Sequence, residues 1–498
     1  MPAEFGWRRW PLLQSAAAGL TLPFAFSPFG LWWLAPIVVA WTTWLWAGMS
    51  SRAAFRAGYL FGFCAFVFGT YWIYISVAVF GQAPVWLAIV LMLGLVAIMA
   101  TYYGLIALAA AFLIGPREWA PGYLAMPAIW AFAEWCRGWV LSGFPWLSLG
   151  YSQLDSPFAG YAPLAGVYGV SAMVVAFSVA GLVAVRSTQR PRWALLTLAA
   201  TIIATGWLVR DVRWSEATNE TVAVALVQGG ITQDKKWLPE SVEPTLALYR
   251  DLTLANADAD VIVWPEVALP VRRQNLGRYM SDLDAVLRRR GAALAYGVID
   301  VDFAAERYYN AVVAAGLGRG SYNKHHLVPF GEYFPVPAFI REWMKMNSLP
   351  YADMSSGAAG QPPVELAGRP VAVSICYEDA FATEQHHMFP AAEYLVNVTN
   401  DAWFGTSIAP YHHLDIARFR SLETGRSQLR VANTGITAII GADGSVMAML
   451  DLFEQGVLRG EIEPRRGVTP YVITGNWLPI GIAAVVIVTV VVRRRVVL

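Results

Sequence analysis

Long apolar runs dominate this sequence and restrict the folds that are open to it. Seven fill most of the first 210 residues and an eighth lies near the end, at about 11–27, 31–48, 58–80, 86–114, 121–141, 163–185, 193–210 and 477–492. A helix needs about 20 apolar residues to cross the roughly 30 Å hydrocarbon core of a bilayer. Lipid offers the backbone no hydrogen-bond partners, so spanning segments fold as helices or closed barrels. The runs therefore predict a polytopic α-helical membrane bundle of about eight spans.

The composition agrees with a membrane protein and excludes some partners. Hydrophobic residues make up 57% of the chain and charged residues 14%, and the net charge of +1 gives no basis for binding nucleic acid. Three scattered cysteines form neither a disulfide framework nor a metal knuckle. The first apolar run follows Arg8-Arg9 as in a signal peptide, but no small-x-small cleavage site precedes the second run. We therefore favour a retained helix.

Basic residues mark alternate ends of the runs. Segments 28–30, 81–84 and 142–162 carry no Lys or Arg, whereas the other junctions carry Arg8, Arg9, Arg52, Arg56, Arg117, Arg186, Arg190, Arg192 and Arg493-Arg494-Arg495. Because basic loops stay in the cytoplasm, both termini are expected there. The predicted parts are a bundle of about seven helices (1–210), an extracytoplasmic domain (211–475), and a last helix with a basic cytoplasmic tail (476–498).

The extracytoplasmic segment alternates predicted strands with helical patterns. Helical spacing recurs around residues 242–249 and 283–287, and a further helix is expected over about 412–423. Strands are expected at 221–227, 260–264, 292–299, 310–317, 371–375, 394–398 and 432–440. This alternation predicts an α/β layered domain, which at about 260 residues can bury a sizeable core.

Three predicted strands of this domain run into polar groups. One precedes Trp264-Pro265-Glu266, the second leads into the segment 322–333 with Lys324 and Glu332, and the third ends at Cys376. Catalytic groups commonly sit on loops that a rigid scaffold positions. The other two cysteines lie within apolar runs, so Cys376 is the one in a polar setting. A buried structural role for Cys376 remains the alternative.

The three groups suit nucleophilic catalysis. A free thiol has a pKa near 8.5, so it is mostly protonated at neutral pH, and a carboxylate in a confined site can take its proton. Glu266 can be that base, and the Lys324 ammonium can stabilise the thiolate and a tetrahedral oxyanion. The backbone N–H of Tyr377 can add a second oxyanion donor.

The motifs that carry these residues resemble the nitrilase, or carbon–nitrogen hydrolase, superfamily. They are Trp264-Pro265-Glu266, the segment 322–333, Ser374 to Glu378, and two further stretches at 397–405 and 417–426. The resemblance implies an α-β-β-α sandwich with a catalytic triad of Glu266, Lys324 and Cys376. It also implies supporting roles for Glu332, Tyr377 and Glu378.

The wider layout, a bundle followed by such a domain and one last span, resembles the apolipoprotein N-acyltransferase family of bacterial inner membranes. Gln228-Gly229 with Trp237 and the segment 134–139 add to the likeness. The resemblance implies a multi-pass enzyme of the bacterial inner membrane, with its catalytic domain on the periplasmic side. It also implies that Cys376 takes an acyl chain from a phospholipid as a thioester, and that the α-amine of an apolipoprotein diacylglyceryl-cysteine accepts it. Trp237 matches a substrate-contact position, no cofactor or metal is implied, and we expect a monomer.

Several alternatives stay open at this point. The enzyme could be a membrane-tethered amidase that transfers its acyl group to water, or the chain could be a catalytically inactive lipid-binding or transport scaffold. Glu332 could be a plain salt-bridge partner of Lys324, and Trp237 could be surface packing.

Two features of the bundle also have more than one interpretation. Glu134 and Arg137 lie three residues apart within one run, and we favour a salt bridge that fixes helix packing over a substrate contact. The aromatic segment Ser142 to Trp146 is expected at the outer surface, where it could grip a lipid or anchor the interface.

Overall fold

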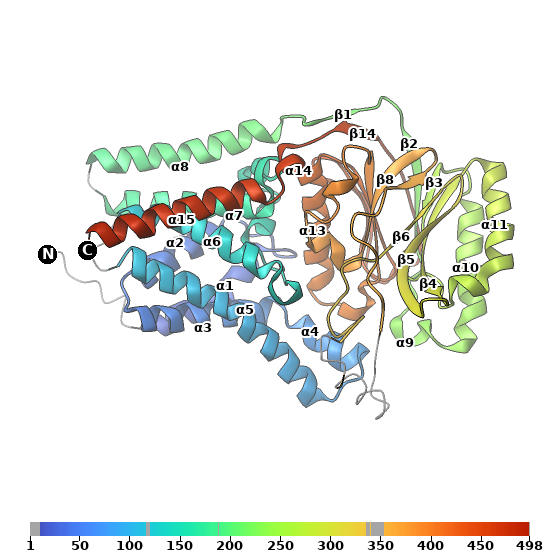
Figure 1. The fold of residues 1–498 in the computed structure, drawn as a ribbon, viewed down its shortest axis with the longest axis horizontal. Coiled ribbons are helices and arrows are strands. Elements are labelled where there is room, and N and C mark those ends of the chain that lie inside the picture. Colours follow the sequence, from blue (N-terminus) through green and yellow to red (C-terminus); the bar gives the residue numbers. More distant parts are fainter. Residues whose placement is uncertain (1–9, 116–119, 188, 335–338, 340–352, 498) are drawn as a thin grey trace. The chain divides into compact units, whose positions relative to one another are not determined.

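The computed structural model describes residues 10–115, 120–187, 189–334, 339 and 353–497, so the predictions that involve Arg8, Arg9 and Arg117 lie outside the described residues. The chain divides into two compact units (Figure 1). One unit comprises Met1–Arg213, Ser407–Asp415 and Ile473–Leu498, and the other comprises Trp214–Thr406 and Ile416–Val472. The first is helical and the second contains the sheets.

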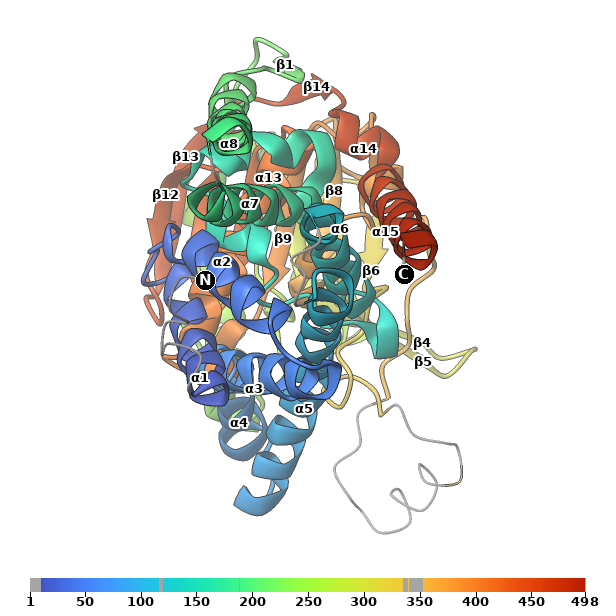
Figure 2. The same ribbon diagram turned by 90° about the vertical axis from the view of Figure 1, so that its left-hand side faces the viewer.

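Figure 2 views several helices of the helical unit nearly end-on. The helices of this unit differ widely in length. They are α1 (Pro11–Thr21), α2 (Leu34–Ala47), α3 (Ser51–Gly69), α4 (Trp72–Tyr74), α5 (Val85–Leu113), α6 (Ala120–Arg137), α7 (Ala162–Arg186), α8 (Gln189–Arg210) and α15 (Trp477–Val497).

Within the described residues, four helices are long and apolar enough to cross a membrane: Val85–Leu113, Pro157–Arg186, Pro191–Arg210 and Trp477–Arg495. A fifth candidate is the pair Ser51–Gly69 and Trp72–Phe80, which is bent by 53°. The other predicted spans coincide with the shorter or less apolar helices α1, α2 and α6. The count of eight therefore stays a prediction.

The charged pair inside the helical unit holds a turn of the backbone. Glu134 accepts hydrogen bonds from Trp130 Nε1 (3.0 Å), Leu149 N (2.8 Å) and Ser171 Oγ (2.6 Å). Arg137, 3.9 Å from the Glu134 carboxylate, donates to Ser148 Oγ (3.1 Å) and to two backbone carbonyls, those of residues 144 and 146. These contacts agree with the packing interpretation, because both charges are used to fix residues 144–149.

The aromatic segment 142–146 differs from its prediction. Phe144 and Trp146 are 9% and 1% exposed, so the expectation that they anchor an outer surface is wrong. Arg137 draws their carbonyls inward, and Trp146 Nε1 donates to His412 Nδ1 (3.1 Å). Burial lowers the pKa of His412 to about 4, so its ring is neutral and its Nδ1 can accept this hydrogen bond.

Two six-stranded sheets form the second unit. The first has the order β13-β2-β3-β4-β5-β6, with bounds Gly456–Ile462, Val222–Gln228, Val261–Val263, Ala293–Asp302, Arg307–Gly316 and Ser321–Asn323. The second has the order β12-β11-β10-β9-β8-β7, with bounds Val446–Leu450, Thr437–Ile440, Gln428–Ala432, Tyr394–Thr399, Arg369–Ile375 and Val364–Leu366. A short pair, β1 (Ser215–Ala217) and β14 (Arg465–Gly467), stands apart from both sheets.

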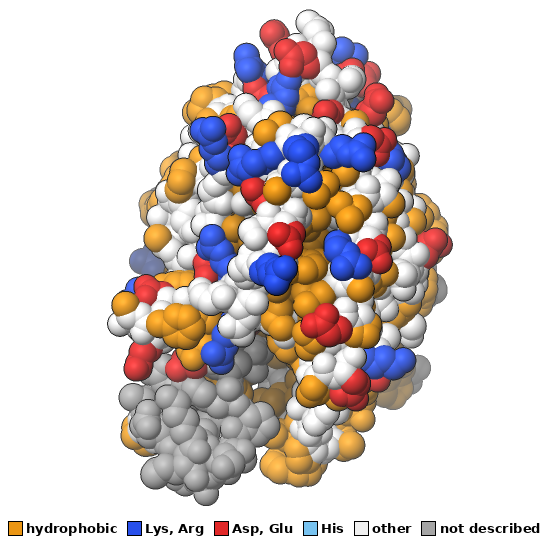
Figure 3. Space-filling model, turned by 90° about the vertical axis from the view of Figure 1, so that its right-hand side faces the viewer, with side chains coloured by type: hydrophobic (Ala, Val, Ile, Leu, Met, Phe, Trp, Pro, Cys, Tyr) orange, Lys and Arg blue, Asp and Glu red, His pale blue; other side chains and the backbone are white. Residues whose placement is uncertain are grey.

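The alternation of side chains along each strand explains the layers. On β2, Val224 and Leu226 belong to a buried cluster that also contains Val373 and Val396 from the other sheet. The intervening Ala225 and Val227 belong to a second cluster, which also contains residues of α10 (Val242–Ala255) and α11 (Gly277–Arg290). Strand side chains point to opposite faces in turn, so one face meets the other sheet and the other meets the helices. The side on which α11 lies carries charges of both signs among apolar atoms (Figure 3).

Most predicted strands lie within a few residues of the observed ones, but one does not. The expected strand 432–440 is two strands, β10 and β11, which pair antiparallel. Residues 433–436 turn between them, and at Gly435 an added Cβ would lie only 2.4 Å from Asp401 Oδ2. The residue at position 435 must therefore be small. Because the residues on both sides of this turn are apolar, the sequence pattern predicted one strand instead of two. Helix α13 (Ala409–Thr424) confirms the helix expected over 412–423.

Candidate active site

The topology of the first sheet brings two of the predicted groups to one edge. Strand β4 is parallel to β3 and antiparallel to β5, and β6 is in turn antiparallel to β5. Strands β3 and β6 therefore run in the same direction, and the residues that follow them, Glu266 and Lys324, emerge at the same edge. Cys376 follows β8, which is parallel to β9 in the facing sheet. Three separate strand ends thus supply the candidate site.

Lys324 lies between two carboxylates. Its Nζ is 3.6 Å from Glu266 Oε1 and 2.8 Å from Glu332 Oε1, and the lysine side chain is 1% exposed. Glu332 also accepts from the backbone N–H of Val328 (2.8 Å). Asn310, on β5, donates through Nδ2 to both carboxylates, at 2.6 Å from Glu266 Oε1 and 3.1 Å from Glu332 Oε1. The four side chains form one polar group, which is buried except at Glu332.

Burial and the two neighbouring charges oppose each other at Lys324. Burial alone lowers the pKa of its ammonium, but the negative charges of Glu332 and then Glu266 outweigh that effect and raise the pKa above its ordinary value. Lys324 therefore keeps its positive charge across the physiological range of pH. A fixed cation at this point can balance negative charge that develops on a thiolate or an oxyanion.

Cys376 has a strained backbone at the end of β8. Its φ is +54°, in the left-handed region that non-glycine residues seldom occupy, and the residue as a whole is only partly exposed. Strain of this kind is commonly stored at functional sites. Burial raises the pKa of the thiol, the charge of Glu266 raises it further, and the charge of Lys324 lowers it. The resting thiol therefore holds its proton.

Four hydrogen-bond donors surround the Glu378 carboxylate. It accepts hydrogen bonds from Tyr322 Oη (3.0 Å) and from the backbone N–H groups of His325 (2.7 Å), His326 (3.0 Å) and Ile375 (2.7 Å). These donors tie the Lys324 loop to the Cys376 loop. Burial raises the pKa of Glu378 to about 7, and the charge of Lys324 opposes the rise.

A further buried network underlies Cys376. Asp379 accepts from Ser374 Oγ (2.7 Å), and Asn397 Nδ2 donates to Ser374 Oγ (2.9 Å) and weakly to the carbonyl of Cys376 (3.4 Å). Arg430 donates to Asn397 Oδ1 (2.9 Å) and to Asp401 (2.8 Å). These hydrogen bonds connect Ser374 and the Cys376 carbonyl to buried charged groups, so the network holds the turn on which the thiol sits.

The remaining predicted residues lie at the same edge of the sheets. Tyr377 packs edge-on against Phe381, with ring centroids 5.0 Å apart. Trp237, which directly follows the short helix α9 (Gln233–Lys236), is 54% exposed. Sequence reasoning missed Asn310, because a lone asparagine within an apolar strand carries no motif.

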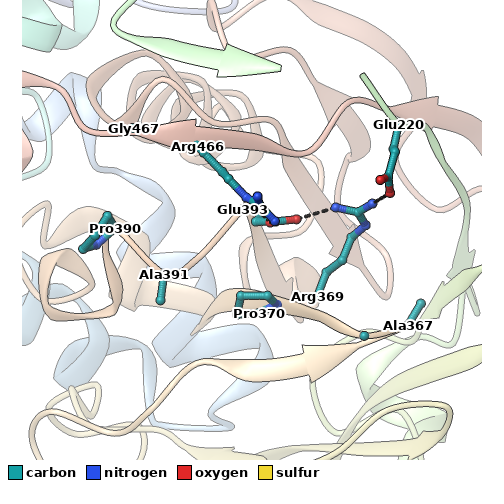
Figure 4. A pocket seen from close by; sticks show the side chains of 10 residues that line it. Glu220, Ala367, Arg369, Pro370, Pro390, Ala391, Glu393, Arg466 and Gly467 are labelled. Atoms are coloured by element: carbon teal, nitrogen blue, oxygen red, sulfur yellow. Dashed lines mark hydrogen bonds and ion pairs between the residues drawn. The ribbon is translucent and has the colours of Figure 1, made fainter. Parts of the chain in front are cut away.

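A separate pocket of about 680 Å³ lies at the opposite end of β8 (Figure 4). Arg369 and Arg466 pair there with Glu393 (2.5 and 2.7 Å), and Arg369 also pairs with Glu220. Because Arg369 begins β8 and Cys376 follows its end, the pocket is not part of the candidate active site.

The sheets, the strained cysteine and the lysine between two carboxylates define a class of protein. Residues 223–470 match the family described as "Carbon-nitrogen hydrolase", so the sheet-containing unit has the nitrilase-like fold. Residues 18–180 match the "Apolipoprotein N-acyltransferase N-terminal domain".

Relatives of nearly full length narrow the class to one family. The chain is similar to the apolipoprotein N-acyltransferase of Methylococcus capsulatus (38% identical, 97% of this chain and 96% of that protein). It is also similar to those of Vibrio vulnificus (37%, 93% and 93%) and Pseudomonas aeruginosa (38%, 98% and 96%). The chain therefore belongs to the apolipoprotein N-acyltransferase family, which confirms the resemblance drawn from the motifs, and it is an acyltransferase. Among solved structures, the NitFhit protein of C. elegans is similar with a TM-score of 0.39 and 16% identity, over 51% of this chain and 62% of that one.

Proposed function

We propose that this protein N-acylates the N-terminal diacylglyceryl-cysteine of apolipoproteins, with a membrane phospholipid as acyl donor. The observation that carries the proposal is the meeting of three strand ends: Lys324 Nζ lies 3.6 Å from Glu266 Oε1. The backbone N–H groups of His325 and His326, directly after Lys324, donate to Glu378, two residues after Cys376. The names of the relatives supply the acceptor, and the geometry supports a covalent route to it.

In the first step, Glu266 takes the proton of the Cys376 thiol as the sulfur attacks the sn-1 ester carbonyl. The Lys324 ammonium and the Tyr377 N–H stabilise the oxyanion of the tetrahedral intermediate. When the intermediate collapses, the C–O bond breaks and the protonated Glu266 returns its proton to the departing lysophospholipid. The acyl chain remains on Cys376 as a thioester.

In the second step, the α-amine of the diacylglyceryl-cysteine attacks the thioester carbonyl. Glu266 takes a proton from the amine, the C–S bond breaks, and that proton returns to the Cys376 sulfur. The product is an N-acylated lipoprotein and the free enzyme. Glu332 and Glu378 hold Lys324 and the nucleophile loop in place, and the exposed ring of Trp237 contacts substrate.

The same proposal sets the arrangement in the membrane. About eight spans, in residues 1–210 and 476–498, hold residues 211–475 on the periplasmic side of the bacterial inner membrane, with both termini in the cytoplasm. In the outer segment, helices flank two facing sheets in an α-β-β-α order, and the enzyme acts as a monomer. Both substrates carry lipid chains, which explains why a nitrilase-like unit is joined to a unit of membrane-spanning helices.

Mass spectrometry of the purified protein tests the proposal. After incubation with phospholipid, Cys376 should carry one acyl group, and a diacylglyceryl-peptide with a free α-amine should remove it and become acylated. Cys376→Ser should abolish both events. Rapid release of free fatty acid without an acceptor would favour the water-transferring amidase instead, and full function of Cys376→Ser would favour an inactive scaffold.

A further inference from the structure

One buried charge beside the candidate active site has no part in the steps above. Lys236, the last residue of α9, is 1% exposed, and its Nζ donates to the backbone carbonyl of Glu266 (3.3 Å). Its neighbour Lys235 is exposed. Burying an ammonium is costly, so it is seldom done without a partner that uses the charge.

The carbonyl that Lys236 holds belongs to a strained turn. Val267, directly after Glu266, has a φ of +44°, which is rare for a β-branched residue. The turn is pressed against Gly297, where an added Cβ would lie 2.3 Å from the Pro265 carbonyl oxygen and 2.8 Å from Glu266 Cα. Directly after Val267, the backbone N–H of Ala268 donates to the Gly297 carbonyl (2.9 Å). A strained turn keeps its shape only when its surroundings hold it.

The charge of Lys236 also suits its position. The Lys324 ammonium faces two carboxylates within 4 Å, so this small group carries one excess negative charge. A second ammonium near Glu266 balances it. Burial lowers the pKa of Lys236 to about 8 and the charge of Glu266 opposes the change, so the side chain is still mainly an ammonium at pH 7.

We propose that Lys236 is a positioning residue, which fixes the strained turn after β3 and thereby aims the Glu266 carboxylate at the Cys376 thiol. The proposal rests on the role of Glu266 given above. A misplacement of about 1 Å in a catalytic group can cost on the order of a hundredfold in rate. Loss of the Lys236 contact should therefore reduce acylation of Cys376 by tenfold to a hundredfold.

A double-mutant cycle tests this role. The single-turnover rate of Cys376 acylation by an activated aryl ester is measured by intact-mass spectrometry for the full-length protein. The set comprises the wild type, Lys236→Met, Glu266→Gln and the double variant, with Lys235→Met as the matched control. Because Lys236 acts through Glu266, Lys236→Met should cost tenfold or more in the wild-type background and less than twofold in the Glu266→Gln background. Lys235→Met should react like the wild type.

Two further measurements separate positioning from general stability. Lys236→Arg keeps a cationic donor and should recover at least a third of the rate, and rates are normalised to the folded fraction. If Lys236→Met does not fold, Lys236→Gln replaces it in the cycle with the same expectation, because glutamine is uncharged and its amide ends one bond short of the position from which the ammonium reaches the Glu266 carbonyl. Equal losses in both backgrounds, or a Lys236 variant that reacts like Lys235→Met, would overturn the inference. A wild-type rate for Glu266→Gln would instead refute the proposed function.

Discussion

Replacing Glu266 with glutamine should change two properties of Cys376 in opposite senses. Glutamine has nearly the same shape but cannot take a proton, so the acylation step loses its general base. Such a base contributes roughly 10²–10⁴-fold to a rate. Acylation of Cys376 by phospholipid should fall by that factor, whereas Glu243→Gln, an exposed substitution on α10, should leave it unchanged.

The acidity of the thiol should nevertheless increase. The charge of Glu266 raises the pKa of Cys376 and that of Lys324 lowers it, so the variant removes an opposing charge and keeps the favourable one. In a site with an effective dielectric constant near 20, two unit charges at the 3.6 Å that separates Lys324 Nζ from Glu266 Oε1 attract by roughly 4–5 kcal/mol. Freed from that partner, the ammonium acts more fully on the sulfur, and the pKa of the thiol falls.

Both properties can be read at the same residue. The pH dependence of iodoacetamide labelling, followed for the Cys376 peptide by mass spectrometry, reports the pKa of the thiol apart from Cys64 and Cys136. The labelling midpoint should move to lower pH in Glu266→Gln while acyl transfer from phospholipid is nearly lost. A midpoint that moves to higher pH, or stays in place, would show that Glu266 does not act on the thiol, and the proposed base would be wrong.

Three further substitutions test other contacts described above. Asn310→Ala removes a donor from the buried Glu266 carboxylate and the partly buried Glu332 carboxylate, each bond worth about 1.5–3 kcal/mol. It should slow acylation at least tenfold, whereas the exposed Asn275→Ala should not. Glu378 has a pKa raised in the folded state from 4.5 to about 7, so its contribution to stability is present below pH 4.5 and is lost as the pH rises to 7. Thermal unfolding should therefore show the wild type losing about 3 kcal/mol relative to Glu378→Gln across that range, and a constant difference would contradict the assignment. Arg137→Met leaves the buried Glu134 carboxylate without its cation and should cost about 3–5 kcal/mol of stability, against little change for the exposed Arg52→Met; equal melting temperatures would refute the structural role.

Part of the candidate site could be predicted because its groups lie where strands end. Glu266 and Cys376 each follow an apolar run that reads as buried, whereas Lys324 follows the short polar strand β6 and was recognised from the motif around it. Asn310 and Lys236 could not be found in this way. The first sits inside a strand and the second on a four-residue helix, and only the folded chain brings them to the carboxylate and the carbonyl of Glu266.

Two predictions from the local sequence pattern were also wrong, because buried contacts determined the structure there. Asn433 to Ile436 form a turn inside an apolar stretch, and Gly435 in that turn lies against Asp401. Phe144 and Trp146 have the composition of an interfacial anchor but are buried, and Trp146 Nε1 donates to His412 Nδ1. In both places a contact distant in the sequence decided the outcome.

The sequence by itself determined that the chain has membrane-spanning helices and a nitrilase-like α/β unit, since apolar length and strand alternation are local properties of the chain. It also predicted the three side chains that we propose as the catalytic groups. Only the tertiary structure decided that two strands of one sheet and one of the other end together, since strand order and direction depend on pairing between distant segments. The same pairing places Lys324 between two carboxylates and so sets the charges that act on Cys376.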